Sequence, residues 1–390
     1  MKAIDSVSSL SIRRSDLDWL RTLAVLLLVP FHSLLVFVQD PDSVVYMKDT
    51  VDCFYCDKVA GFIHQFHMPV LFIIAGMSSW FALTRRSGGQ YLSNRVFRLL
   101  IPLVFGLAIL VPPMTYITQI DQGKTLTFWK HYANFFSFSS DLSGRQGTFT
   151  TGHLWFILYL IAYSLVALPL FLLLQRKGSQ GVVRGMARFF EKPLALLLLG
   201  VVVAAGGRTE FFGDLNPIYY FLVFLCGYLL MTNEGYQKAI DRDWPVMLLL
   251  GVILEILRDT GQPVTVDGTL PRALRDVAME FNRWVWLLAI LGIGHRLLNR
   301  GGKVLKYLSE AAYPFYLLHL LVLTAVSYFV VQIHGVVAVK YLLIVSITFG
   351  ITFLVYEGAR RVLPLRFLMG LKTNRPRSQE VKKEVLEERA

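Results

Sequence analysis

The sequence predicts an all-α integral membrane protein of about ten transmembrane helices, with both termini in the cytoplasm. Hydrophobic residues make up 55% of the 390 residues and charged residues only 17%. This balance is typical of a chain that spans a membrane, not of a soluble protein with a large core. Basic segments recur between alternate apolar runs, so the formal net charge of +12 mainly reflects cytoplasmic loops. No nucleic-acid partner is therefore expected.

The first apolar stretch, Leu17 to Val38, carries the ionisable residues Asp18, Arg21 and His32. Such groups are costly inside a membrane and usually face a polar interior. Helical geometry places Arg21 and His32 on nearly the same face, with His32 about 16 Å deeper, and Pro30 predicts a kink. This face is a candidate functional track. The alternative is that Asp18 and Arg21 pair at the membrane edge while His32 hydrogen-bonds a neighbouring helix.

The flanks of this stretch predict its orientation. Two arginines precede it, and the loop that follows carries five aspartates against two lysines, which places the N-terminus in the cytoplasm. No small-residue cleavage site is evident, so we expect the stretch to remain as a signal anchor. In the loop, Cys53 and Cys56 predict either a local disulfide or two free thiols, and no zinc site.

Nine further apolar runs follow. The second includes Ala75 and Gly76, small residues that predict a close helix contact, and prolines 102, 112 and 113 predict breaks in the third. Basic segments at 85–98 and 175–192 should be cytoplasmic, and polar segments at 121–151 and 258–280 should lie outside. The predicted domains are 1–16, 17–365 (the membrane domain) and the charged cytoplasmic tail 366–390. The expected runs are 59–83, 99–120, 152–174, 193–205, 217–231, 244–257, 281–293, 312–333 and 336–356.

Histidines and arginines are the candidates for chemistry. A neutral histidine can act as a general base, and clustered arginines can bind phosphates. The positive-inside rule explains cytoplasmic arginines equally well, and His67 could cap a helix start while His153 lies at the interface beside Trp155. The candidates are His32, His64, His67, His153 and His319, with Arg21, Arg85, Arg86, Arg95 and Arg98.

Four short motifs, in chain order, resemble those of the acyltransferase-3 family of membrane acyltransferases. Together they span nearly the whole chain. One departs from the family pattern, because Ala75 stands where serine is usual. The acid that many members carry just after Trp155 is also absent. The motifs are Asp18-Trp-Leu-Arg21 with His32, Phe72-Ile-Ile-Ala75-Gly76, Arg95-x-x-Arg98, and Tyr313-Pro-Phe-Tyr316-Leu-Leu-His319.

Further segments are most similar to a branch of that family linked to the succinylation of periplasmic glucans. They are Phe62-Ile-His64, His153-Leu-Trp155-Phe156, Gly294-His-Arg-Leu-Leu-Asn299 and Pro364-Leu-Arg-Phe-Leu368. The resemblance implies transfer of an acetyl or succinyl group from cytoplasmic acyl-CoA, as a co-substrate, to a hydroxyl of an extracytoplasmic glycan. It also implies a bacterial inner-membrane location, with the bilayer as the other partner. No bound cofactor and no metal is expected.

On this basis we assign roles to the candidate residues. His32 is expected to be the general base, or to accept the acyl group briefly, and Arg21 to stabilise the developing oxyanion. The aromatic segment Phe128 to Phe138 could stack on sugar faces. Donor binding is assigned to Arg95, Arg98, Arg85 and Arg86, and supporting roles to Asp18, His67, His153, Trp155, Tyr316 and His319.

Two other functions fit the same sequence. Broken helices and intramembrane charges also suit a transporter or permease for a glycan or an anionic metabolite, although no inverted repeat is visible. A scaffold without chemistry of its own is the third possibility, but it has no need for buried charges.

Overall fold

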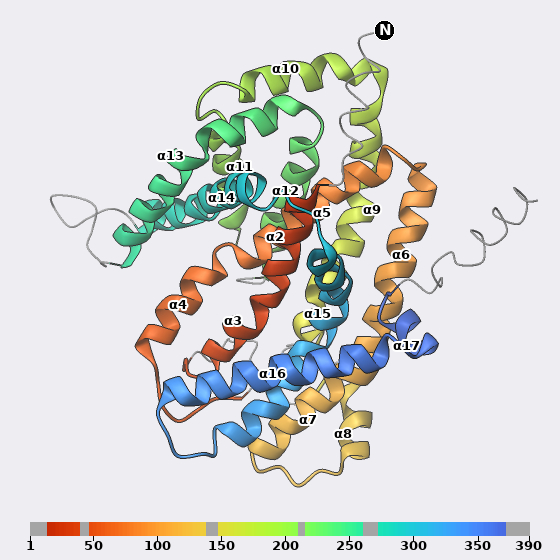
Figure 1. The fold of residues 1–390 in the computed structure, drawn as a ribbon, viewed down its shortest axis with the longest axis vertical. Coiled ribbons are helices and arrows are strands. Elements are labelled where there is room, and N and C mark those ends of the chain that lie inside the picture. Colours follow the sequence, from red (N-terminus) through yellow and green to blue (C-terminus); the bar gives the residue numbers. More distant parts are fainter. Residues whose placement is uncertain (1–13, 40–46, 138–146, 210–214, 260–271, 372–390) are drawn as a thin grey trace, which may run out of the picture.

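The computed structural model describes residues 14–39, 47–137, 147–209, 215–259 and 272–371 (Figure 1). Every regular element in these ranges is a helix, which confirms the predicted all-α class. The expected tail 366–390 lies outside the described residues from position 372 on, and the expected segment 1–16 lies outside them up to position 13.

The chain folds into a bundle in which α5 lies centrally and α16 crosses one end (Figure 1). The elements are α2 (Ser15–Leu26), α3 (Leu28–Leu35), α4 (Phe54–His64), α5 (His67–Leu83), α6 (Gly88–Phe105), η1 (Gly106–Leu110), α7 (Val111–Asp121), α8 (Phe128–Phe135), η2 (Gly152–Leu154), α9 (Trp155–Gln175), η3 (Lys177–Ser179), α10 (Gln180–Phe190), α11 (Leu197–Gly207), α12 (Pro217–Leu230), α13 (Glu234–Asp259), α14 (Arg272–Leu297), α15 (Lys303–Val330), α16 (Val337–Ala359) and α17 (Leu363–Leu368).

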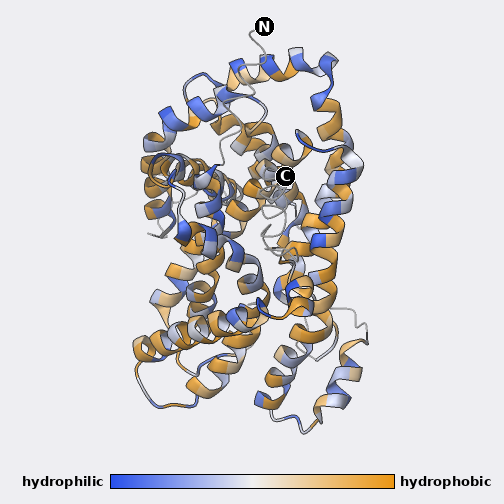
Figure 2. Ribbon diagram, turned by 45° about the vertical axis from the view of Figure 1, so that its right-hand side comes forward, coloured by the Kyte–Doolittle hydropathy of each residue, from blue (hydrophilic) through white to orange (hydrophobic). Residues whose placement is uncertain are grey.

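Among the described residues, seven helical stretches are long and apolar enough to cross a bilayer. Two more apolar helices, α11 and α12, are shorter. Hydrophobic residues dominate the long helices, and hydrophilic ones are frequent along α10 at the top of the view (Figure 2). The molecule is therefore a multi-pass membrane protein. The seven stretches are 15–35, 54–83, 88–121, 152–175, 277–297, 303–330 and 337–359.

Several predicted limits were wrong. Helix α6 begins eleven residues before the expected span, because Ser87 and Gln90 form a capping box at a polar start. Pro102 lies inside α6 and does not end it; the break is the π-helical turn η1, followed by prolines in the first turn of α7. Helices α13 and α14 extend into the polar segment 258–280, and α10 occupies the segment 175–192.

Helices α5 and α12 cross at very close range. A Cβ atom added to Gly76 would lie 2.0 Å from the carbonyl oxygen of Phe224, and one added to Gly227 would lie 2.0 Å from that of Ile73. Only glycine fits at either position, because the two backbones touch there. The small-residue contact that the sequence predicts at Gly76 is confirmed. It fixes α5, which begins at His67, in the middle of the bundle.

Candidate functional site

His32 lies in the last turn of α3, behind a break in the first span. The helix is interrupted at Leu27, three residues before Pro30, whose missing N–H leaves the Leu26 carbonyl without its helical partner. Backbone hydrogen bonds from Leu27 N–H to Leu23 O (2.9 Å) and from Phe31 N–H to Leu27 O (3.0 Å) continue the helical pattern across the interruption. The His32 side chain is only 5% exposed. The predicted kink therefore exists, and it aims a buried imidazole into the bundle.

Five histidines from four separate segments meet around His32. His319, from α15, is fully buried, and its ring centroid lies 5.4 Å from that of His32 at an interplanar angle of 21°. The His153 ring lies 5.1 Å from His319, edge on. On the other side, Phe31 contacts His67 with centroids 4.3 Å apart, and His64 lies 5.5 Å from His67. The sequence named all five as candidates, and the fold brings them together.

Backbone carbonyls select the tautomers of two of these rings. His319 Nδ1 lies 2.7 Å from the Tyr316 carbonyl and His153 Nε2 lies 3.1 Å from the Leu317 carbonyl. A carbonyl only accepts, so each of these nitrogens carries the proton. The other nitrogen of each ring then keeps a basic lone pair. Within the described chain, His319 Nε2, His153 Nδ1 and His32 Nδ1 are buried without a hydrogen-bond partner.

Tyr316 and Trp155 make different contacts near His153. The Tyr316 hydroxyl donates to the His153 backbone carbonyl and so ties α15 to the η2 turn that precedes α9. Trp155 packs on aromatic rings, with Tyr220 and Tyr159 each 5.2 Å away. Tyr316 is thus placed to hold His153, and Trp155 anchors the start of α9.

The cluster is not arranged as a metal centre. In the part of the chain that the structure describes, no three histidine, cysteine, aspartate or glutamate side chains are placed to hold a metal ion. Imidazoles packed against one another and against Phe31 suit proton transfer instead.

Arg21 and Asp18 lie at the start of the same span and pair with each other at 3.1 Å, with the arginine side chain 42% exposed. Arg21 and His32 are eleven positions apart, which corresponds to about 16 Å along a helix. This is about half the thickness of the hydrocarbon core, so Arg21 lies well away from His32 along the helix axis. Its role at the oxyanion stays a prediction.

The four arginines assigned to the donor differ in their surroundings. Arg95 donates from Nη2 to the Ala75 carbonyl (3.2 Å) and to Ser79 Oγ (2.9 Å), and its guanidinium lies over the Tyr91 ring. It is thereby held against α5. Arg98, Arg85 and Arg86 are exposed, and none of them forms an ion pair within the described ranges.

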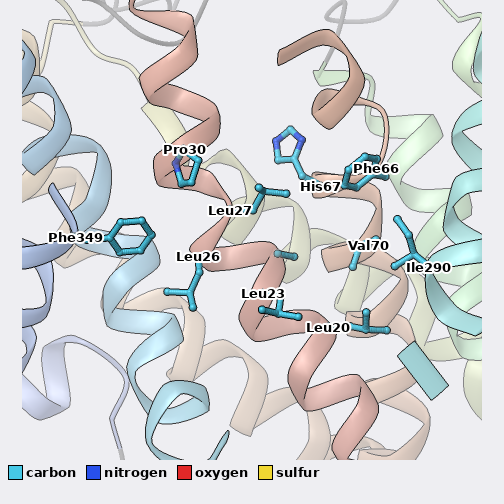
Figure 3. A pocket seen from close by; sticks show the side chains of 11 residues that line it. Leu20, Leu23, Leu26, Leu27, Pro30, Phe66, His67, Val70, Ile290 and Phe349 are labelled. Carbon is cyan, nitrogen blue, oxygen red and sulfur yellow. The ribbon is translucent and has the colours of Figure 1, made fainter. Parts of the chain in front are cut away.

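An apolar cavity of about 450 Å³ follows the first span toward the histidines. Figure 3 shows His67 and Pro30 at one end of it and Leu20 at the other. Sequence reasoning missed this cavity, although the i, i+3, i+4 stripe of Leu20, Leu23, Leu27 and Pro30 is its signal. The full lining is Leu20, Leu23, Ala24, Leu26, Leu27, Pro30, Phe66, His67, Val70, Ile290 and Phe349.

A second cavity, of about 610 Å³, lies where α15 begins. Arg300, Lys303 and Trp19 line it, and the Trp19 indole donates to the Arg300 carbonyl at 2.9 Å. Trp19 and Leu23 are four residues apart, so the two cavities follow the same face of α2. Sequence reasoning assigned no role to these two cations.

The aromatic segment predicted to meet sugars forms α8 over Phe128–Phe135. Trp129 is 76% exposed, whereas Phe135 is fully buried. His131, on the same helix, is buried between Thr115 Oγ1 (3.0 Å) and the Pro112 carbonyl (3.1 Å), and burial lowers its pKa. Phe138 lies outside the described residues.

Comparison with known proteins agrees with the motifs. The acyltransferase 3 family, described as an acyltransferase domain, matches residues 14–357. The chain is 24% identical to the glucans biosynthesis protein C of Salmonella typhi and 23% identical to that of Salmonella paratyphi A. Each alignment covers 91% of this chain and 94% of the relative. No solved structure matches the chain.

Proposed function

The chain belongs to the acyltransferase 3 family, and from this premise we propose that it moves an acetyl or succinyl group from cytoplasmic acyl-CoA to a hydroxyl of an extracytoplasmic glycan. The observation that carries this proposal is the buried contact of His32 with His319, beside His153, whose Nδ1 is also buried without a hydrogen-bond partner. The similarity to glucans biosynthesis proteins supports a periplasmic glucan as the acceptor. The compartment is then the inner membrane of a bacterium, with about ten spans and both termini inside.

His32 is the base in the proposed reaction. Its unprotonated nitrogen takes the proton of the acceptor hydroxyl while the hydroxyl oxygen attacks the thioester carbonyl. The carbon–sulfur bond then breaks, and the imidazolium returns the proton to the departing thiolate. Direct transfer and a short-lived acyl-histidine both use the same residue. His319, stacked on His32, orients its ring.

The apolar cavity supports a path for the donor. It begins near Leu20, beside Arg21, and ends at His67. An uncharged arm and thioester could lie in it while charged phosphates stay at the membrane edge, because burying phosphates in an apolar channel is prohibitively costly. Arg21 would then meet the donor near the mouth of the channel.

Two groups of cations are available for those phosphates. Arg98, Arg85 and Arg86 are exposed, whereas Arg95 is hydrogen-bonded to α5. Arg300, Lys303 and Trp19 line the second cavity. This cavity follows the same face of α2 as the apolar cavity. A guanidinium binds phosphate in bidentate fashion and an indole ring can stack on a base.

The test is thiol release by the purified protein in nanodiscs. Acetyl-CoA and succinyl-CoA are each supplied with and without a periplasmic glucan, to the wild type and to His32→Ala. Glucan-dependent release that His32→Ala loses supports the proposal and names the donor. The matched control is His334→Ala, which removes an exposed histidine outside the cluster. No release from folded wild type with either donor would overturn the proposal and favour a permease, to be followed by glycan flux in sealed vesicles.

A further inference from the structure

The segment 47–53 closes on the end of α3 through a dense set of hydrogen bonds. Lys48 Nζ donates to the carbonyls of Leu35 and Val38, each at 2.8 Å. The Asp49 N–H donates to the Val36 carbonyl at 2.9 Å, and the Cys53 N–H donates to the Phe37 carbonyl at 2.8 Å. These carbonyls lie at the end of α3 and just beyond it, where no further helical turn supplies regular donors. The segment thus caps the turn that carries His32.

A buried ion pair joins this segment to a distant helix. Lys340 Nζ, at the start of α16, lies 2.6 Å from Asp49 Oδ2, and the two side chains are 8% and 1% exposed. The same ammonium donates to the Val331 carbonyl at 3.2 Å, just after α15 ends. The other oxygen of Asp49 accepts the Val51 N–H at 3.0 Å. One cation therefore connects the cap of α3 to the end of the helix that carries His319.

Stability alone is a poor explanation for such a pair. Taking both charges out of water costs about as much as their attraction returns, so an apolar pair of similar size is often equally stable. Separating the two side chains would leave each charge buried without its partner, which is strongly destabilising. The pair therefore keeps together the elements that carry it. Here the elements that meet are the ends of α3 and α15, the two helices whose imidazoles stack.

We propose that Asp49 and Lys340 are positioning residues that hold His32 against His319 during acyl transfer. The proposal rests on the function proposed above. The Lys340 ammonium contacts both Asp49 and Val331, so it sets the separation of the two helix ends. His32 lies three residues before Leu35 on one of these ends, and a misplacement of about 1 Å at the reacting groups can lower a rate 100-fold.

The experiment compares Asp49→Asn, Lys340→Met and the double variant in nanodiscs. Each single variant leaves a buried charge unpaired and is expected to lower the unfolding temperature. The double variant removes both charges, so its unfolding temperature should return towards that of the wild type. We expect kcat to fall at least about tenfold in all three, with the KM of donor and glucan unchanged, since neither side chain meets a substrate. Recovery of kcat in the double variant would overturn the proposal, because charge balance alone would then explain the effect.

Asp243→Asn is the matched control. Asp243 is as buried as Lys340, pairs with Arg242 at 2.7 Å and accepts the Leu194 N–H, away from the cap of α3. It should lose stability while keeping kcat. If Lys340→Met fails to fold, the isosteric Asp49→Asn carries the test by itself.

Hydrogen exchange supplies a readout that does not depend on activity. The amides of 28–38 should exchange faster in the Asp49 and Lys340 variants than in Asp243→Asn. Each variant is measured at the same interval below its own unfolding temperature. Unchanged exchange there would overturn the positioning role even if kcat fell. If the wild-type protein transfers no acyl group, the proposed function itself is wrong. If the wild type is active and the Asp49 and Lys340 variants keep a normal kcat, only this inference is wrong.

Discussion

The imidazole rings of His32 and His319 lie 5.4 Å apart and nearly parallel, although 287 positions separate them in the sequence. Neither ring has a carboxylate partner among the described residues. Backbone carbonyls fix the protons of His319 and His153, which leaves a buried lone pair on the other nitrogen of each ring. The alignment of these rings therefore depends on backbone carbonyls and helix packing and not on carboxylate partners.

Replacement of the two stacked histidines should separate their roles. His32→Asn should lower kcat by about 100- to 10,000-fold, the contribution of a general base. His319→Asn should lower kcat less, because it removes the orienting ring and keeps the base. Single-turnover kinetics with labelled acyl-CoA measures both. Equal losses would show that the two rings act as one unit.

Arg95 and Arg98 should behave differently despite their shared motif. Arg95→Ala removes the charged donor to the Ala75 carbonyl and to Ser79 Oγ, which then keep the hydroxyls of Ser79 and Tyr91 as donors, and should cost about 1–3 kcal/mol of unfolding free energy. Arg98→Ala should leave stability unchanged and raise the KM of the donor. Thermal unfolding and donor titration distinguish these outcomes. Comparison with Arg300→Ala then shows which group of cations holds the phosphates.

Filling the apolar cavity should block the donor. Ala24→Phe places a ring in the channel between Leu20 and His67, so the KM of the donor should rise about tenfold or more, since the arm loses its space. Leu354→Phe, on the exposed face of α16, is the control and should have no effect. A normal donor KM in folded Ala24→Phe would place the donor elsewhere.

The crossing of α5 and α12 should tolerate no side chain. Gly76→Ala brings a Cβ to 2.0 Å from the Phe224 carbonyl oxygen, so the helices must separate and the yield of folded protein should collapse. Gly350→Ala, where no atom lies within 4 Å, should fold normally. Size-exclusion chromatography in detergent reports both. Normal folding of Gly76→Ala would contradict the close contact.

The docking of α8 should weaken in acid. Burial lowers the pKa of His131 below its ordinary value of 6.5, so the folded helix holds a neutral ring. Below pH 6.5 the unfolded segment binds a proton that the folded one does not. The stabilisation is therefore complete above pH 6.5 and falls as the pH drops. Hydrogen exchange of 128–135 between pH 5 and 7.5 measures this, and His131→Gln should remove the pH-dependent part. The same pH dependence in that variant would assign it to another group.

Composition and local pattern were enough to predict the class of the protein and the kinds of side chain at its candidate site. Long apolar runs specify membrane helices because an isolated helix satisfies its own backbone in lipid. A buried histidine is conspicuous in such a run because it is costly there. The five histidines and the break near Pro30 were therefore visible before the fold. The helix limits were less so, because polar turns extend a helix beyond the apolar run that marks it.

The tertiary structure alone decided which of these side chains meet. Whether His153 faces His319, whether Arg95 points to solvent or to the Ala75 carbonyl, and whether Asp49 finds Lys340, 291 positions away, depend on how helices cross. Crossings are set by contacts between distant positions, such as Gly76 with Phe224, and no local pattern records them. Composition and periodicity are local properties of the chain, whereas a site built from four segments is not.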